Sequence, residues 1–419
     1  MAMVDYRKTS KDVAVLRGLA ERKALLAAHP ENLERKQLWY AHDAGHGERP
    51  MVLAEGWVAF EQLPESQLAC EEEWARTVEQ GLRFELFQFD HLQDDHVLEP
   101  FMATNWRVSL GNYGVESKIT WASTSGGNVT SRHWEPPVKD LDHDVDLLQP
   151  REFSVDHEGT LAYKALLDEV FDGILPVQLR GGFWWTAGLT QPLIELIGLN
   201  EMMIFMCTHP EGMHRLMAFL RDDHLALVDW LEREHLFSLN NLNDYVGSGS
   251  MGYTHALPQS DRTERDPVRP KDLWLLSESQ ETVSISPAMF EEFVFQYQLP
   301  IVERFGRLYY GCCEPMHIKW PVVKRFPNLK RLSISPWCDQ EYMARECGRE
   351  YVFSRKPNPT LVSTSYFDED AIRADLRETL EIAGTCNLEF VMKDVHTLAG
   401  QPDRLKRWVA IAREEIDTI

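Results

Sequence analysis

Residues 308–419 alternate between strand-like and helix-like runs, and this order constrains the fold more than any other feature of the sequence. The strand-like runs are "RLYYGCC", "LKRLSIS", "EYVFSRKP" and "NLEFVMKDV", and helical runs such as "EDAIRADLRETLEIAG" separate them. Repeated strand–helix units predict parallel strands, because each helix returns the chain to the starting end of the sheet. A long series of such units most often closes on itself, so we expect an α/β fold of the TIM-type (β/α)8 barrel class.

The rest of the chain is less regular. Apolar residues recur at helical spacing over "TQPLIELIGLNEMMIFMCTHPEGMHRLMAFLRDDHLALVDWLEREH", which predicts two or three helices in the middle of the chain. Residues 1–150 mix helix-like segments with stretches that contain Trp, Tyr and His. We therefore predict an N-terminal extension over residues 1–150, helical and mixed and packed on the barrel, and the barrel itself over residues 151–419.

Charge and hydropathy exclude two classes of partner. The chain carries a formal net charge of −23, spread along its length, and such a charge is repelled by phosphate backbones, so we expect no nucleic acid. No apolar run approaches the roughly 18–20 residues of a membrane span, and the N-terminus is charged and helix-like, so we expect no membrane. The seven irregularly spaced cysteines agree with a reducing compartment, and we expect a cytoplasmic protein.

Reactive side chains gather where the predicted strands end. Barrel active sites are built there, because the strand ends and the loops after them share one rim. The residues at the four ends are Cys312, Cys313 and Glu314, then Ser335, Trp337 and Asp339, then Arg355 and Lys356, and finally Lys393, Asp394 and His396. We predict one active site on this rim, with these candidate catalytic residues: Tyr310, Asp339, Lys356, Lys393 and Asp394.

Two adjacent cysteines, Cys312 and Cys313, follow the first of these strands. Neighbouring cysteines rarely form a disulfide with each other, because the backbone must distort to join their sulfurs. Successive side chains of a strand point to opposite faces, so one thiol should face the barrel interior and the other the surrounding helices. We predict that Cys312 is the functional thiol and that Cys313 packs against the helices. Packing of both thiols is the alternative.

Several stretches carry a resemblance to a known family. They are "SISPAMFEEFVFQYQLPIVERFGRLYYGCCE", "FPNLKRLSISPWCD" and "QPDRLKRWVAIARE", with the glycine-rich "NDYVGSGSMGYT" further upstream. The sequence resembles the uroporphyrinogen decarboxylase superfamily, in the branch that contains cobalamin-dependent (corrinoid) methyltransferases, over most of residues 160–419. The resemblance implies a TIM-barrel enzyme that moves a methyl group between a small substrate and a corrinoid on a separate protein.

The resemblance also implies a zinc site. Methyltransferases of this branch commonly hold zinc through a His-x-Cys pair at a strand end and a later cysteine near the C-terminus. Here Tyr310-Gly311-Cys312 occupies the first position, and the later cysteine falls around Val395. We therefore expect zinc to be held by other residue types that it accepts, with one coordination position left open for catalysis. The candidate ligands are Cys312, Glu314, His396 and Glu278.

The tryptophans suggest the kind of substrate. Ligand pockets favour aromatic walls with a few polar groups, and the chain contains thirteen tryptophans. Trp337, directly after a predicted barrel strand, and Trp184, in "GGFWWT", are the candidate substrate-binding residues. A methoxylated aromatic compound would fit such a pocket.

The predicted function is therefore zinc-assisted O-demethylation of an aryl methyl ether, with transfer of the methyl group to cobalamin. The expected partners are the small methylated substrate, the corrinoid carrier protein that supplies the cobalamin and, in a homodimer, a second copy of the chain. Two alternatives stay open: a metal-free decarboxylase like the one that names the superfamily, and a non-catalytic corrinoid-binding or ligand-binding protein. The acidic chain disfavours a polycarboxylate substrate, which weighs against the decarboxylase.

Overall fold

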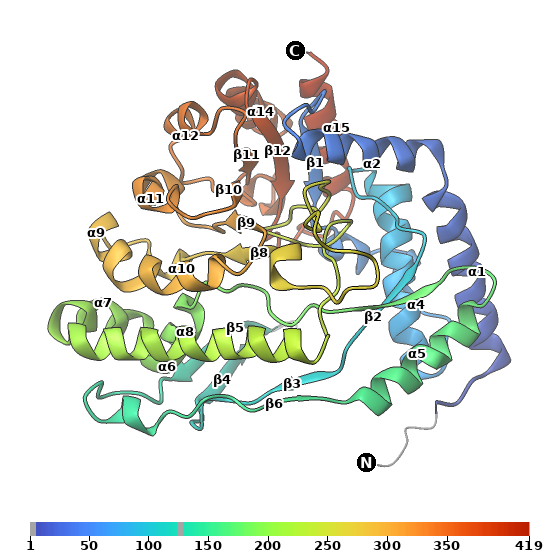
Figure 1. The fold of residues 1–419 in the computed structure, drawn as a ribbon. Coiled ribbons are helices and arrows are strands. Elements are labelled where there is room, and N and C mark those ends of the chain that lie inside the picture. Colours follow the sequence, from blue (N-terminus) through green and yellow to red (C-terminus); the bar gives the residue numbers. More distant parts are fainter. Residues whose placement is uncertain (1–5, 124–128, 419) are drawn as a thin grey trace.

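The computed structural model describes residues 6–123 and 129–418. A six-stranded parallel sheet lies at its centre, with the strand order β1-β12-β11-β10-β9-β8 (Figure 1). The strands are β1 (Met51–Ala54), β8 (Trp274–Ser277), β9 (Arg307–Tyr310), β10 (Leu329–Ile334), β11 (Val352–Arg355) and β12 (Asn387–Met392). The predicted alternation after residue 308 is thus confirmed, and the carboxyl ends of these strands share one edge of the sheet.

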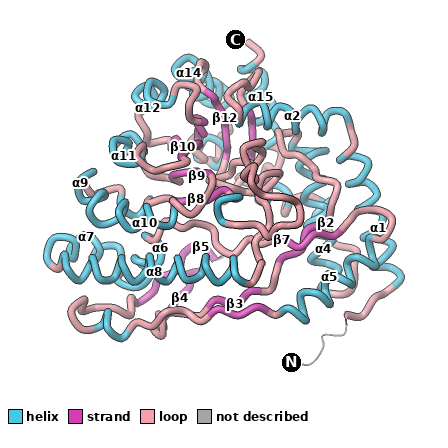
Figure 2. Tube along the Cα trace, viewed as in Figure 1, coloured by secondary structure: helices cyan, strands magenta, loops and turns pink. Residues whose placement is uncertain are grey.

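Helices that alternate with the strands cover the outer face of the sheet (Figure 2). They are α9 (Pro287–Phe290), α10 (Gln296–Val302), α11 (Met316–Val323), α12 (Gln340–Cys347), α13 (Thr360–Ser363), α14 (Glu369–Ala383) and α15 (Arg404–Ile416). The strand residues Leu332, Phe353 and Phe390 are fully buried in one core with Leu376 of α14 and Trp408 of α15. Apolar burial on this scale is the main source of stability, so the outer face fixes the sheet in place.

The remaining strands form three pairs. β2 (Met102–Asn105) runs parallel to β7 (Val177–Arg180), whereas β3 (Val108–Leu110) is antiparallel to β6 (Phe153–Val155). A hairpin joins β4 (Lys118–Ser123) to β5 (Val129–Glu135). Among the described residues, no hydrogen-bonded ladder connects the β2–β7 pair to the six-stranded sheet. The α/β class is therefore as predicted, while closure of the sheet into a barrel is not seen in its ladders.

The part of the chain up to residue 233 contains helices as well as the strands β1–β7. Its helices are α1 (Ser10–Ala27), α2 (Pro30–Asp43), α3 (Trp57–Phe60), α4 (Glu73–Phe87), α5 (His157–Phe171), α6 (Thr190–Ile197), α7 (Leu199–Thr208) and α8 (Pro210–Arg233). The last three are the helices predicted in the middle of the chain. Residues 1–150 do more than cover the sheet, because they supply β1, which pairs with β12.

A glycine-rich segment, residues 244–255, fills the inner face of the sheet, which is the face turned away from α11, α12, α14 and α15. A Cβ atom on Gly247 would lie 2.0 Å from the Tyr309 ring, and one on Gly249 would lie 2.4 Å from Val391. Gly249 also has φ +88°, a conformation that favours glycine. The glycines therefore let this segment approach the strands closely.

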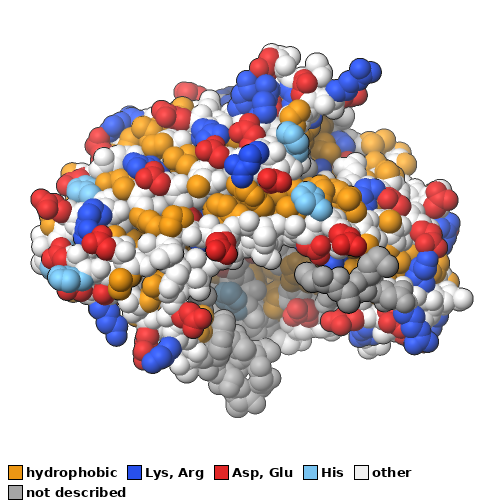
Figure 3. All heavy atoms as spheres, turned by 60° about the horizontal axis from the view of Figure 1, so that its bottom comes forward, with side chains coloured by type: hydrophobic (Ala, Val, Ile, Leu, Met, Phe, Trp, Pro, Cys, Tyr) orange, Lys and Arg blue, Asp and Glu red, His pale blue; other side chains and the backbone are white. Residues whose placement is uncertain are grey.

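The surface carries side chains of both charges. On the face shown in Figure 3, acidic and basic side chains are interspersed with separate hydrophobic patches. The net charge of −23 is thus not gathered into one acidic area on that face. Within the described part of the chain, every helix is too short or too polar to cross a membrane.

Candidate active site

A buried cluster of three side chains lies at the carboxyl edge of the sheet. Lys393, after β12, donates a hydrogen bond of 2.9 Å to Ser248 Oγ, and its Nζ lies 3.9 Å from Cys312 Sγ. Ser248 in turn lies 3.6 Å from the same sulfur. All three residues are buried. The structure thus brings together two of the predicted residues, Cys312 and Lys393, and adds a serine from the glycine-rich segment.

The electrostatics of this cluster favour a thiolate beside an ammonium group. A hydrogen bond from Cys313, the positive charge of Lys393 and a hydrogen bond from Ser248 lower the pKa of Cys312 against the opposing effect of burial. Burial also acts to lower the pKa of Lys393, but the negative charges around it outweigh burial and raise that pKa. Each group therefore stabilises the charged form of the other.

Cys313 corrects one expectation. It is exposed and does not pack against the helices; its sulfur lies 3.6 Å from Cys312 Sγ and 3.7 Å from Asp394 Oδ2. The reason is Gly311, whose φ of +98° ends the regular alternation of β9 before the two cysteines. Both thiols therefore lie at the same edge, and the proximity of Cys312 raises the pKa of Cys313.

Lys356, after β11, occupies the same inner face. Its ammonium donates to the Tyr309 hydroxyl at 2.9 Å, to Ser354 Oγ at 2.5 Å and to the Ser354 carbonyl at 3.3 Å. Burial lowers the pKa of Lys356 to about 7, and the nearby charge of Lys393 acts in the same direction. Lys356 can therefore take up and release a proton near neutral pH, which is the property required of a general acid or base.

Two predicted catalytic residues have roles outside this cluster. Tyr310 is fully buried on the helix-facing side of β9, where its hydroxyl donates to Gln298 Oε1 at 3.0 Å and its oxygen lies 3.2 Å from Ser279 Oγ. Its neighbour Tyr309 takes the inner face, as strand alternation requires. Asp339 caps α12 by accepting a hydrogen bond of 2.9 Å from the Tyr342 amide. Such caps stabilise helix ends.

Asp394 lies at the edge beside Lys393. Its carboxylate is 3.5 Å from Lys393 Nζ, and its backbone amide donates to Glu55 Oε2 at 3.2 Å. Glu55 follows β1, which is the strand next to β12. An acidic group thus follows each of the neighbouring strands β1 and β12, near the cluster.

The predicted zinc ligands do not converge. Both carboxylate oxygens of Glu314 accept backbone hydrogen bonds, from Ser279 at 2.9 Å and from Cys312 at 2.7 Å. His396 is exposed. Across residues 6–123 and 129–418, no three His, Cys, Asp or Glu side chains are grouped so that they could hold a metal. The residues as arranged therefore do not fit a zinc site, and zinc stays a prediction for direct measurement.

Glu278 is a buried acid in largely acidic surroundings. Its Oε2 accepts from the Gln280 amide at 2.9 Å, and its Oε1 has no hydrogen-bond partner. Burial, together with the negative charges of Glu281 and Glu314, raises its pKa well above the usual range. This shift favours the neutral acid, which makes Glu278 a poor ligand for a cation.

An aromatic cavity of about 350 Å³ lies beside the cluster. Small residues leave room for it, since β2 contributes Ala103 and the chain after β7 contributes Gly181 and Gly182. Its aromatic walls come from Phe101, Phe183, Trp184, Trp185, Phe237, Trp274 and Tyr245. Tyr245 also interacts electrostatically with Lys393, which connects the cavity to the cluster. Trp184 lies in the wall of this cavity, and its contact with a substrate stays a prediction, whereas Trp337 is 66% exposed and does not line this cavity.

Sequence reasoning missed several residues of the inner face. They are Glu55, Tyr245, Ser248, Tyr309, Ser354 and Glu389. Two signals could have found some of them: the glycine-rich "GSGSMG" around Ser248, and the alternation of β12, which sets Glu389 on the same face as Lys393. An acid in the middle of a mostly apolar strand needs a buried partner, so it marks a polar interior.

The fold is shared with a known structure. A methyltransferase from Methanosarcina mazei superposes with a TM-score of 0.51 at 12% sequence identity, and the match covers 91% of this chain and 98% of that one. No family model matches the sequence, and no curated protein matches it either. At this identity the likeness shows a common α/β architecture over nearly the whole chain.

Proposed function

We propose that this chain is a methyltransferase that takes a methyl group from an aryl methyl ether and passes it to the cobalamin of a separate corrinoid protein. The observation that carries the proposal is the buried cluster of Cys312, Ser248 and Lys393 beside an aromatic cavity at the carboxyl edge of the sheet. The fold likeness to a methyltransferase and the sequence resemblance to the corrinoid-dependent branch support it.

The proposal includes a complete TIM-type barrel. Eight strands are available, because the parallel pair β2–β7 adds two to the six of the main sheet. We place this pair between β1 and β8, at the open side of the sheet, where the aromatic cavity lies. The cavity lining supports this placement, since it includes residues of β2, of the chain after β7 and of β8.

Demethylation of an ether needs a proton for the oxygen that leaves. The corrinoid supplies the electron pair of the new bond to carbon, and the electrons of the broken carbon–oxygen bond stay on oxygen. We assign the proton to Lys356, whose pKa of about 7 lets it donate near neutral pH. Lys393 keeps its charge and stabilises negative charge as it develops on the leaving oxygen.

The cavity suits a flat aromatic donor. Aromatic walls favour stacked or edge-on contacts with a substrate ring. Polar groups at the same wall, Asn105 and the ion pair of Arg180 with Asp244, could orient ring substituents. A donor bound there would lie between Trp184 in the cavity wall and Tyr245 beside the cluster.

The corrinoid protein needs a surface on which to dock. Exposed apolar side chains follow the carboxyl ends of five strands of the sheet, where such a surface would lie: Trp57 after β1, Val283 after β8, Ile318 after β9, Trp337 after β10 and Tyr366 after β11. Exposed apolar groups gathered on one face mark interaction sites. We therefore move Trp337 from the substrate pocket to the proposed docking surface. A homodimer stays a separate proposal, tested by sedimentation.

The test is an anaerobic assay of the purified protein with cob(I)alamin. Methoxyarenes, methylamines and methyl thiols are offered in turn, and absorbance reports formation of methylcobalamin. We expect methyl transfer from methoxyarenes and its loss in Lys356→Met. Cys347→Ala is the matched control, because Cys347 is buried in the outer core, away from the cluster. Transfer from none of these donors would refute the proposal, and transfer from methylamines alone would refute the donor class.

A further inference from the structure

Lys356 is linked to the carboxylate of Glu389 through the hydroxyl of Ser354. Its Nζ donates to Ser354 Oγ at 2.5 Å, and the Ser354 hydroxyl donates to Glu389 Oε1 at 2.5 Å. Tyr309 closes the arrangement, because its hydroxyl accepts from Lys356 and donates to Ser354 at 3.0 Å. All four side chains are buried on the inner face of the sheet.

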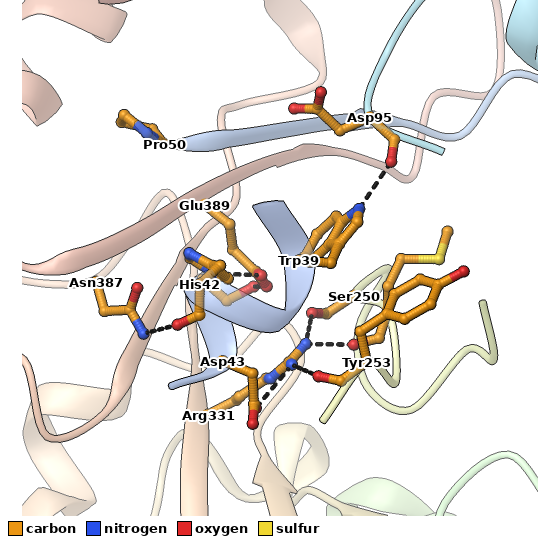
Figure 4. Close-up of polar contacts among 12 residues, drawn as sticks. Trp39, His42, Asp43, Pro50, Asp95, Ser250, Tyr253, Arg331, Asn387 and Glu389 are labelled. Carbon is orange, nitrogen blue, oxygen red and sulfur yellow. Dashed lines mark hydrogen bonds and ion pairs between the residues drawn. The ribbon is translucent and has the colours of Figure 1, made fainter. Parts of the chain in front are cut away.

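The chain of contacts continues to the N-terminal part of the protein. His42, at the end of α2, lies 3.2 Å from Glu389 Oε2 through its Nε2, and its carbonyl accepts from Asn387 of β12 at 2.6 Å (Figure 4). His42 and Glu389 are almost fully buried. Asp43, the next residue, forms an ion pair of 3.0 Å with Arg331 of β10. The end of α2 is thus held against the inner face at two points.

We propose that Glu389 and His42 are positioning residues for Lys356, acting through Ser354 to aim its amine at the leaving group. This inference rests on the proposed function, in which Lys356 supplies the proton. Neither positioning residue touches the substrate. Their role is to set the direction and protonation of a third residue.

The hydrogen-bond directions explain how the positioning works. A serine hydroxyl has one hydrogen to give, and Ser354 gives it to Glu389. The serine oxygen is therefore left to accept from both Lys356 and Tyr309. Without the carboxylate, the Ser354 hydroxyl could rotate and point its hydrogen at the ammonium, which would displace Lys356.

The titratable groups around Lys356 come from several elements. They are the phenol of Tyr309 on β9, the thiol of Cys312 after β9, the carboxylate of Glu55 after β1, and Glu389 and Lys393 on β12. Burial and Lys393 lower the pKa of Lys356, whereas Glu389, Cys312 and Glu55 raise it. Removing the negative charge of Glu389 should therefore lower that pKa further.

The proton step is balanced within this arrangement. One N–H bond of Lys356 breaks as the leaving oxygen gains an O–H bond, and the amine becomes neutral. The reaction consumes one proton for each methyl group that moves, so Lys356 must be reprotonated from solvent before the next turnover. Because a general acid acts in its protonated form, activity falls as pH rises through the pKa of Lys356.

The test compares Glu389→Gln and Ser354→Ala with a matched control, Asp375→Asn. Asp375 pairs with Arg355 on the opposite, helix-facing side of β11, at 3.0 Å, so its loss removes a buried ion pair without touching the inner face. The first readout is the titration of the Lys356 side chain by NMR on lysine labelled at Cε, assigned with Lys356→Met. The second is the pH profile of methyl transfer.

We expect Glu389→Gln to lower the Lys356 midpoint by about one pH unit and to lower kcat about tenfold with KM unchanged. Glu389→Asp should restore part of the Lys356 midpoint and part of kcat. Ser354→Ala should lower kcat similarly. It is the variant that tests the inference if Glu389→Gln does not fold. Unchanged titration in both variants would overturn the inference. Because the NMR titration needs no methyl transfer, a shifted midpoint in a protein that transfers no methyl group would refute the proposed function while supporting the link between Glu389 and Lys356.

Discussion

At the scale of single residues, neighbours in sequence take very different environments. Tyr309 and Tyr310 are adjacent in β9, yet Tyr309 bonds to Lys356 and Ser354 on the inner face, while Tyr310 is packed under the helices. Strand alternation predicts that the two differ, but it cannot say which one faces inward, because that depends on where the helices pack. The assignment of Tyr310 to catalysis came from its position in a resemblance and missed its neighbour.

The two adjacent thiols lead to a prediction about ionisation. Lys393 helps lower the pKa of Cys312, so Lys393→Met should raise that pKa and move thiolate formation to higher pH. The measurement is the ultraviolet absorbance of the thiolate against pH, taken as the difference between each protein and its Cys312→Ala counterpart. Lys118→Met, which removes an exposed lysine, is the control and should leave the curve in place. Identical curves for all three would show that Lys393 does not act on Cys312.

At the scale of elements, the sequence predicted the helices and strands that depend on neighbouring residues. It missed the contacts between segments that are distant in sequence. The strands and helices after residue 308 follow from apolar periodicity and are confirmed. β1 was missed because its four residues, "MVLA", carry no pattern of their own and become a strand only by pairing with β12. Ser248 lies 64 residues from Cys312 in sequence, so only the folded segment 244–255 could reveal their contact.

The glycine-rich segment supports a prediction about stability. Gly247→Ala would place a methyl group 2.0 Å from the Tyr309 ring, and the packed strand behind that ring leaves it little freedom to move. We expect a loss of about 2 kcal/mol or more in the free energy of unfolding, with loss of methyl transfer as Ser248 is displaced. Urea denaturation measures the first effect. Gly81→Ala, in α4 with nothing close to the new methyl group, should instead be neutral or slightly stabilising.

At the scale of the whole molecule, the carboxyl edge combines a reactive cluster with exposed apolar side chains. Trp337 is 66% exposed and Tyr366 is 73% exposed, so each can be removed without leaving a cavity in the core. We expect Trp337→Ala and Tyr366→Ala to raise the KM for the corrinoid protein about tenfold while the melting temperature and the rate with free cob(I)alamin stay unchanged. Leu25→Ala, which removes an equally exposed side chain from α1, is the control. Equal KM values for all these proteins would place the docking surface elsewhere.

The polar interior also ties the stability of the whole fold to pH. Burial alone would raise the pKa of Glu389, but the hydrogen bond from His42 and the charges of Arg331 and Lys356 outweigh burial and hold that pKa well below its usual 4.5. The ionised group therefore stabilises the folded state above pH 4.5, and this contribution is lost as pH falls below it. Glu389→Gln should lower the free energy of unfolding at pH 7 by about 3 kcal/mol, because it removes a buried negative charge that stabilises Arg331 and Lys356. The difference in unfolding free energy between Glu389→Gln and the unaltered protein should narrow as pH falls from 4.5, which urea denaturation at a series of pH values would show.

Glu61→Gln, at an exposed position after α3, is the control. Its unfolding free energy should change with pH in the same way as that of the unaltered protein. A constant gap between Glu389→Gln and the unaltered protein at every pH would mean that Glu389 is already neutral in the fold, and that its hydrogen bonds, not its charge, hold β12 to α2.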